Sequence, residues 1–183
     1  MINFRQYRGP ITIEFSTDKE KNVTVFLGDN SAGKSTFIQA FMWAFYGEID
    51  LERPKDILNK EVESEMYTNC PDEVVCVSVD LVHDGVRYIV EKKAVYGCKT
   101  PKSSYLKDSL PTVIWYYDGG EKIHANANVA AQFRDKIMPQ DLSGYFFFDG
   151  EHIEKLYKRN DLKQSIAKIM GLTPLNLTSA RQA

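Results

Sequence analysis

Two short segments near the N-terminus have the hydrophobic pattern of β-strands. Residues 11–15 alternate apolar and polar side chains, and residues 22–27 are rich in β-branched side chains and lead directly into Gly28. Alternation with a period of two is typical of a half-buried strand, and a short apolar run before glycine is typical of a buried one. We therefore predict strands over 11–15 and 22–27.

The period changes immediately after these segments. Beyond Lys34, apolar side chains recur every three or four residues as far as Gly47, and glycine is a common helix terminator. The recurring positions are Phe37, Ile38, Phe41, Met42, Ala44 and Phe45. This spacing predicts a buried helix of about three turns.

Later in the chain, strand-like runs are joined by residues typical of tight turns. The runs 74–81 and 87–92 flank His-Asp-Gly at 83–85, and the run 112–117 is followed by Asp-Gly-Gly at 118–120. Such turn residues between β-branched runs predict antiparallel hairpins. A doubly wound fold would instead alternate strands and helices, so we expect a mixed architecture.

The remaining segments are less regular. Residues 99–111 have the composition of an exposed loop, which we expect to connect two parts of one sheet. Residues 129–137 have helical spacing and stop before Pro139, which cannot continue a helix. We predict a short buried strand over 145–148 and a return to helical structure over 153–170.

The junction between the second predicted strand and the first predicted helix fits the pattern G-x-x-x-x-G-K-[ST]. Its residues are Gly28, Asp29, Asn30, Ser31, Ala32, Gly33, Lys34, Ser35 and Thr36. A strand before this pattern and a helix after it are the context that a phosphate-binding P-loop requires. The alternative is a glycine-rich turn that binds no ligand.

Each fixed position of this P-loop has a chemical purpose. Gly28 and Gly33 can adopt backbone angles closed to other residues, which lets successive N–H groups turn towards phosphate. We expect Lys34 to reach the outer phosphates, Ser35 to bind Mg²⁺ and Thr36 to donate to the inner phosphate. All nine residues are therefore predicted to bind ATP with Mg²⁺.

Composition limits the class of protein. The 183 residues are 43% apolar, which is enough for one globular domain with a buried core. The 23 basic and 25 acidic side chains nearly cancel, which excludes binding to duplex nucleic acid by overall charge alone.

Cellular location is suggested by what the sequence lacks. Cys70, Cys76 and Cys98 are odd in number and lack C-x-x-C spacing, so we expect structural thiols in a reducing cytosol. No window approaches the roughly 18 apolar residues of a membrane span, and the N-terminus lacks an apolar signal region. We expect a soluble, cytoplasmic protein without a membrane partner.

Three motifs together resemble the N-terminal lobe of SMC-type ABC ATPases, a layout that SbcC and RecF proteins share. They are Asn-Phe-Arg at 3–5, the P-loop at 28–36, and Phe-Met-Trp-Ala-Phe-Tyr-Gly at 41–47. The stretch Gly-Tyr-Phe-Phe-Phe-Asp-Gly-Glu-His-Ile at 144–153 more specifically resembles the DndD family, the ATPases of bacterial DNA phosphorothioate modification.

The resemblance implies an α/β P-loop NTPase fold with a mixed sheet and an antiparallel β subdomain. The P-loop core would comprise about 1–60 and 139–172, with an antiparallel insertion at about 73–124. A C-terminal lobe outside the 183 residues would carry the Walker B carboxylates and the signature sequence, so this chain alone would be a weak ATPase or inactive. Two heads would form a homodimer around two nucleotides and act on DNA together with sulfur-modification proteins.

The resemblance also assigns two further residues. Arg5 matches an arginine that reaches the phosphates of the nucleotide, and a surface arginine is the alternative. Asp149 stands where the general ABC pattern has a glutamine that senses Mg²⁺ and the attacking water, a departure that agrees with the DndD-like pattern. Asp149 and Lys34 are therefore the catalytic candidates, and Asp149 and Ser35 the metal candidates. Alternatively, Asp149 caps the helix that follows it.

Several alternatives stay open at this point. A DNA repair or recombination ATPase of the SbcC or RecF kind has the same layout, and a non-hydrolysing module that docks partners only with ATP bound would need the same P-loop. Trp115, Tyr116 and Tyr117 could stack on nucleic-acid bases or be core and cross-strand residues. The histidines His83, His124 and His152 lack metal-ligand spacing.

Overall fold

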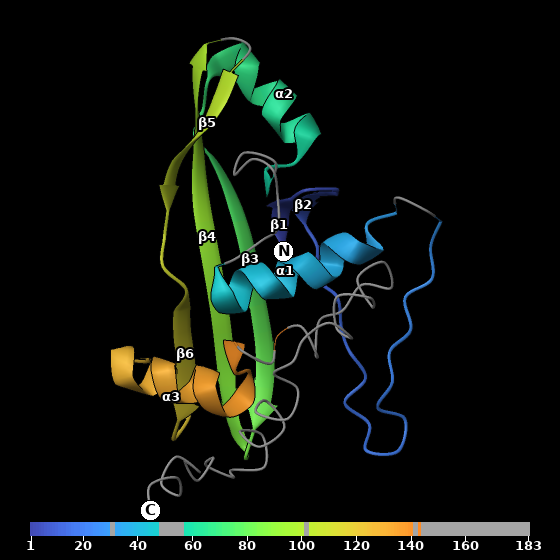
Figure 1. Ribbon diagram of the computed structural model, residues 1–183, viewed down its shortest axis with the longest axis vertical. Helices are drawn as coiled ribbons and strands as arrows, with labels where there is room; N and C mark the ends of the chain where they lie inside the picture. The colour runs from blue at the N-terminus through green and yellow to red at the C-terminus, as the bar shows by residue number, and fades with distance from the viewer. Residues whose placement is uncertain (30–31, 48–56, 101–102, 141–142, 144–183) are drawn as a thin grey trace, which may run out of the picture. The chain divides into compact units, whose positions relative to one another are not determined.

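The computed structural model describes residues 1–29, 32–47, 57–100, 103–140 and 143. The chain divides into two compact units, Met1–Met138 and Pro139–Ala183. The first unit contains every helix and strand described below (Figure 1). The predicted division into a P-loop core and an insertion stays a prediction.

One sheet organises the first unit. Its strands are β1 (Ile2–Phe4), β2 (Tyr7–Pro10), β3 (Glu73–His83), β4 (Val86–Thr100), β5 (Ser103–Ser109), β6 (Val113–Asp118) and β7 (Glu121–His124). The strand order is β2-β1-β3-β4-β6-β7, and β5 pairs with β4 beside this path. Every pairing among the described strands is antiparallel. The antiparallel part of the predicted fold is therefore confirmed, whereas the parallel pairs of a mixed sheet do not occur in the described residues.

Tight turns produce two of the hairpins, as predicted. Strands β3 and β4 pair without interruption from Glu73 opposite Tyr96 to His83 opposite Val86. The two residues between them, Asp84 and Gly85, have φ angles of 50° and 78°. Gly119 and Gly120 between β6 and β7 have φ angles of 55° and 90°. Positive φ at both positions gives the backbone twist that matches paired strands.

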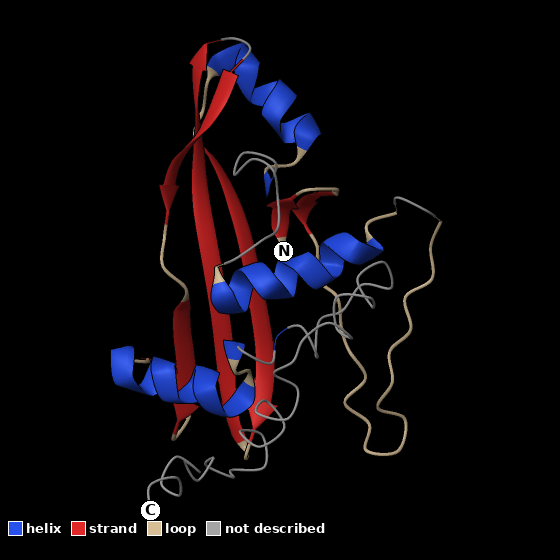
Figure 2. Ribbon diagram, viewed as in Figure 1, coloured by secondary structure: helices blue, strands red, loops and turns tan. Residues whose placement is uncertain are grey.

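Helices α1 (Lys34–Tyr46) and α3 (Ala127–Ile137) lie against the same face of the sheet (Figure 2). Helix α1 confirms the predicted buried helix and ends at Gly47, whose left-handed backbone lets its N–H donate to Trp43 O. Helix α3 confirms the helix predicted over 129–137 and begins two residues earlier, because the Asn126 side chain accepts from Val129 N at 3.0 Å.

Two hydrophobic clusters lie under these helices. The first joins Phe4 of β1 and Trp43 of α1, with ring centroids 5.5 Å apart, to Tyr96 of β4. The second joins Phe45 of α1 to Phe133 of α3 over the middle of the sheet. Residues of α1 belong to both clusters, so the core holds this helix in place along its length.

The prediction of two strands before the P-loop is wrong, because residues 11–15 and 22–27 pair with no strand in the described structure. The side chains of Val23, Val25 and Leu27 are 74%, 71% and 93% exposed. A strand requires a neighbouring strand to satisfy its backbone, and the local sequence pattern does not supply one. Phe15 and Phe26 nevertheless contact each other and the Phe37 ring of α1.

Tertiary contacts also convert the predicted loop at 99–111 into strand β5. Ser104 is buried there and donates to Glu63, and the exposed Lys107 pairs with Asp72. Glu63 belongs to α2 (Lys60–Asn69), a helix absent from our predictions, which lies at the β5 end of the sheet (Figure 1). Side-chain partners on α2 therefore outweigh the loop-like composition of this strand.

The expectation of three structural thiols is corrected. Cys70, directly after α2, forms a disulfide with Cys98 of β4, and Cys76 is a buried free thiol whose pKa is raised by burial. A separation of 28 residues does not reveal such a pair, because the packing of α2 on β4 brings the two cysteines together. Within the described part of the chain, no helix has the length and apolar composition to cross a membrane.

Candidate phosphate-binding site

The first turn of α1 has the features of an anion-binding helix end. Gly33 is its N-cap with φ 95°, and within the described residues no side chain caps the helix. The first turn also contains no acidic residue that would compensate the positive end of the helix dipole. The N–H groups at this end are therefore suited to binding phosphate oxygens.

Lys34 folds back over the loop that precedes it. Its ammonium donates to Gly28 O and Asp29 O, both at 2.7 Å, and Ala32 N donates to Asp29 O at 3.2 Å. The positive charge of Lys34 thus lies at the start of the loop, beside Gly28 and Asp29. Asn30 and Ser31 lie outside the described residues.

The two P-loop glycines are needed for different reasons. Gly33 has the left-handed backbone that we predicted. Gly28 is not in the left-handed region, but a Cβ there would lie 3.1 Å from Ala32 Cβ. Gly28 therefore permits a close approach across the loop rather than an unusual backbone angle.

The turn between β1 and β2 fastens onto the start of α1. Tyr7 donates its hydroxyl proton to Gly33 O at 3.1 Å, and Thr36 donates to Gln6 Oε1 at 2.5 Å. Burial raises the pKa of Tyr7, so its hydroxyl keeps the proton that it donates. A Cβ on Gly33 would lie 3.2 Å from the Tyr7 hydroxyl oxygen. Gln6 and Tyr7 therefore hold the P-loop against the sheet.

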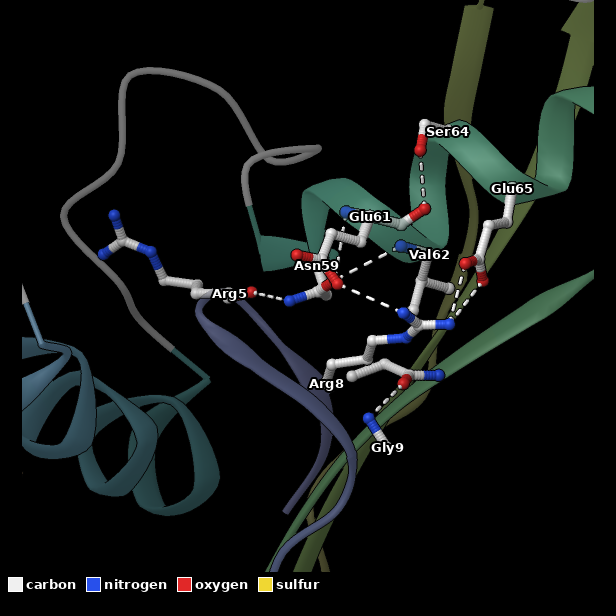
Figure 3. Close-up of polar contacts among 9 residues, drawn as sticks. Arg5, Arg8, Gly9, Asn59, Glu61, Val62, Ser64 and Glu65 are labelled. Carbon is white, nitrogen blue, oxygen red and sulfur yellow. Dashed lines mark hydrogen bonds and ion pairs between the residues drawn. The ribbon is translucent and has the colours of Figure 1, made fainter.

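Arg5 belongs to the same turn and reaches α1 one helical turn after Ser35. Its guanidinium donates to Gln39 Oε1. Its backbone has φ 52° and is held on both sides: Arg5 N donates to Ile57 O at 2.7 Å, and Asn59 Nδ2 donates to Arg5 O at 2.5 Å. The side chain points away from α2 (Figure 3).

Asn59 connects this turn to α2. Its side-chain oxygen caps α2 by accepting from Glu61 N at 3.0 Å and Val62 N at 3.2 Å, while its own N–H donates to Asn3 O. Nearby, Arg8 of β2 pairs with Glu65 at 2.7 Å (Figure 3). The start of α2 thus fixes the backbone from which Arg5 extends.

A known protein family matches nearly the whole chain. The model of a family described as an AAA domain matches residues 1–179. This chain belongs to the AAA domain family. No curated protein matches the chain. AAA domains are ATP-binding ATPase domains that generally use Mg²⁺, and the match covers the P-loop and all described elements.

The described residues of this AAA domain fit ATP with Mg²⁺. The uncapped helix end supplies N–H donors for the phosphates, and the Lys34 ammonium supplies positive charge. Ser35 is exposed in the first turn of α1, where its hydroxyl could be a metal ligand. In the described part of the chain, no group of three acidic, histidine or cysteine side chains could hold a metal ion. Among the predicted metal ligands, the structure describes Ser35, whereas Asp149 lies outside the described residues.

Several predicted site residues are not placed by the structure. Asp149 lies outside the described residues, as do Asn30 and Ser31, the predicted strand at 145–148 and the predicted helix over 153–170. Thr36 is described, is buried, and donates to Gln6. Its predicted contact with phosphate, like that of Arg5, stays a prediction.

Sequence reasoning missed four residues that build the AAA domain site. They are Gln6, Tyr7, Gln39 and Asn59. Asn59 was detectable, because asparagine is a favoured N-cap residue and the acidic residues Glu61 and Glu63 in the next turn are typical of a helix start. The roles of Gln6 and Tyr7 depend on contacts over about 30 residues of sequence, for which a single sequence has no local signal.

Proposed function

We propose that this AAA domain is the N-terminal lobe of an SMC-like ATPase head. It binds ATP with Mg²⁺ and, together with a C-terminal lobe, hydrolyses ATP to drive DNA phosphorothioate modification or a related phage defence. The observation that carries the ATPase proposal is the Lys34 ammonium on Gly28 O and Asp29 O beside an uncapped α1. The modification role is supported by the resemblance of residues 144–153 to the DndD family.

The proposed roles follow from charge and position. Lys34 would stabilise negative charge on the outer phosphates, and Ser35 would be a ligand of Mg²⁺, which supplies further positive charge there when bound. Arg5 lies beside Gln39, one turn along α1, so a rotation of its flexible side chain would direct the guanidinium to the phosphates. Asp149 would be a second residue that holds Mg²⁺, and its carboxylate would accept a hydrogen bond from the attacking water.

The exposed segment before the P-loop, residues 22–27, is an argument for the existence of a second lobe. Val23, Val25 and Leu27 alternate along 22–27 with more than two thirds of each side chain exposed. A row of exposed apolar side chains on a backbone without a strand partner favours pairing with another strand. We propose that a strand of the C-terminal lobe pairs with this segment.

The test is ATP turnover by the chain after addition of its C-terminal lobe. We expect hydrolysis only from the combination, and its loss by at least about 100-fold in Lys34→Ala. Lys21→Ala is the matched control, because Lys21 is also exposed and lies in the segment before the P-loop. Turnover that is unaffected by Lys34→Ala would contradict the proposal.

The finer role is tested with DNA from cells that express the whole system. Phosphorothioate linkages that disappear in Lys34→Ala would support DNA modification. Turnover without such linkages would favour a repair or recombination ATPase. ATP binding without turnover, even with both lobes, would favour a nucleotide-gated docking module.

A further inference from the structure

The sheet face opposite α1 and α3 carries two aromatic rings, each with a cation beside it. Lys122 Nζ lies 4.7 Å from the centroid of the Trp115 ring, and Arg87 Cζ lies 4.8 Å from that of Tyr117. The His124 ring packs edge-on against Trp115 at 5.0 Å. These five residues, which we call the aromatic–basic face, come from β4, β6 and β7.

Strand alternation explains why these rings leave the core. Ile114 and Tyr116 of β6 belong to the hydrophobic cluster under the helices. Trp115 and Tyr117 alternate with them and must therefore point to the opposite face. The sequence left open whether these aromatic residues face the core or the surface. Tyr116 is partly buried and packs against the core, whereas Trp115 and Tyr117 form part of a half-exposed surface on the opposite face.

Charge distinguishes this face from an ordinary protein-docking surface. Arg87 pairs with Asp80, which lowers the pKa of Asp80, and Lys93 pairs with Glu91. Within the described residues, Lys122 has no carboxylate partner. Charged side chains beside the rings are unfavourable at the core of a protein interface. A cation without a carboxylate partner beside an aromatic ring instead suits a polyanion whose bases have π-faces.

We propose that the aromatic–basic face binds unpaired bases of single-stranded nucleic acid. Trp115 and Tyr117 are two residues apart on a strand, which separates them by about 6.6 to 6.8 Å. This separation is about twice the 3.4 Å rise between stacked bases. A single nucleic-acid strand that is stretched until its bases unstack can therefore place one base on each ring. A base replaces Lys122 over the indole ring, and the released ammonium pairs with the adjacent phosphate.

This inference rests on the DNA-linked function proposed above and assigns it a contact surface. Binding is measured without ATP, so a failure here is distinguishable from a failure of the ATPase proposal. The variant Lys34→Ala, in which ATP binding should be lost, is expected to bind single strands normally.

Tryptophan fluorescence gives a direct readout, because the chain has two tryptophans and Trp43 is only 2% exposed. In Trp43→Phe, titration with an oligothymidylate should quench Trp115. Tyr117→Ala should weaken the affinity by about 5- to 150-fold, the usual effect of losing one stacked base. Lys122→Ala should lower the slope of log affinity against log salt by about 0.7, since one phosphate contact is lost.

The sheet contains a matched control at its other end, where Lys99 Nζ lies 5.0 Å from the Tyr105 ring. Lys99→Ala with Tyr105→Leu should leave the affinity unchanged. Trp115→Phe should retain more affinity than Trp115→Leu, and thermal unfolding confirms that each variant folds. The proposal is overturned if Trp115 is not quenched, if the control variant loses as much affinity, or if duplex DNA binds equally with the same mutational response.

Discussion

The antiparallel sheet and the segment before the P-loop have similar strand-like sequences but different structures. Strands β3 and β4 pair over their whole shared length, and their alternate side chains are buried under α1 and α3. Residues 22–27 are equally β-branched, yet in the described structure they pair with no strand. A strand pattern thus gives a strand only where a partner is available.

The difference between the two regions shows which strand pairings follow from nearby turn residues. Asp84-Gly85 and Gly119-Gly120 bring each strand to its partner within a few residues, so the hairpins follow from turn chemistry. The turn before residues 22–27 contains no glycine and is held by Asp18, which accepts from Glu20 N and Lys21 N. Ser16 N donates to Thr24 Oγ1 across this turn, but no backbone ladder forms between 11–15 and 22–27. Variants in the two regions should therefore differ in their effect on stability.

The largest loss of stability is expected from a substitution at the contact between β1 and α1. Phe4→Ala removes a fully buried ring from Trp43 and should lower the free energy of unfolding by about 3 to 5 kcal/mol. Urea unfolding measures it. The matched variant Phe26→Ala, in the unpaired segment with a 42% exposed ring, should cost clearly less, and equal losses would contradict the comparison.

Asn59→Ala should have the next largest effect, about 2 kcal/mol. It removes both the cap of α2 and the hydrogen bond to Arg5 O. Asn59→Asp is the informative control, because aspartate keeps the cap but cannot donate to Arg5. Thermal unfolding should place this variant between wild type and Asn59→Ala; if both variants unfold alike, the bond to Arg5 contributes nothing.

Glu63 makes the α2–β5 contact dependent on pH. Burial opposes its charge, but hydrogen bonds from Ser104, Tyr67 and Lys60 outweigh burial and lower its pKa below 4.5. A lowered pKa stabilises the fold above the unfolded-state value, and this contribution is lost as pH falls through the folded-state value. Glu63→Gln should cost about 1 to 2 kcal/mol at pH 7.

The measurement for Glu63 is urea unfolding between pH 7 and pH 3. The difference between wild type and Glu63→Gln should shrink as pH falls below 4.5. Glu65→Gln, on the exposed side of the same helix, is the control and should show a smaller difference throughout. A difference that is independent of pH would show that the charge of Glu63 does not matter.

The smallest effect is expected in the unpaired segment. Val25→Thr keeps the β-branched shape at a 71% exposed position and should change the free energy of unfolding by less than about 0.5 kcal/mol. Val90→Thr, at a fully buried position of β4, should cost more because the hydroxyl enters the core. Similar costs in urea unfolding would show that the segment is packed in solution.

The sequence was sufficient for features with a local cause. Helix α1, its end at Gly47 and the left-handed Gly33 all follow from residue type and spacing. Strand β5 was missed because Ser104 is buried only through its bond to Glu63 of α2. In the site, Lys34 was predicted from its motif, whereas Gln6 and Tyr7 act through distant contacts that no local pattern encodes.

The most direct test of the account is a calorimetric titration of this chain with ATP and Mg²⁺. We predict saturable binding by wild type and by Lys21→Ala, and its loss in Lys34→Ala, because the Lys34 ammonium lies on the Gly28 and Asp29 carbonyls. Equal affinity of the wild type and Lys34→Ala would contradict the assignment of the P-loop as the nucleotide site.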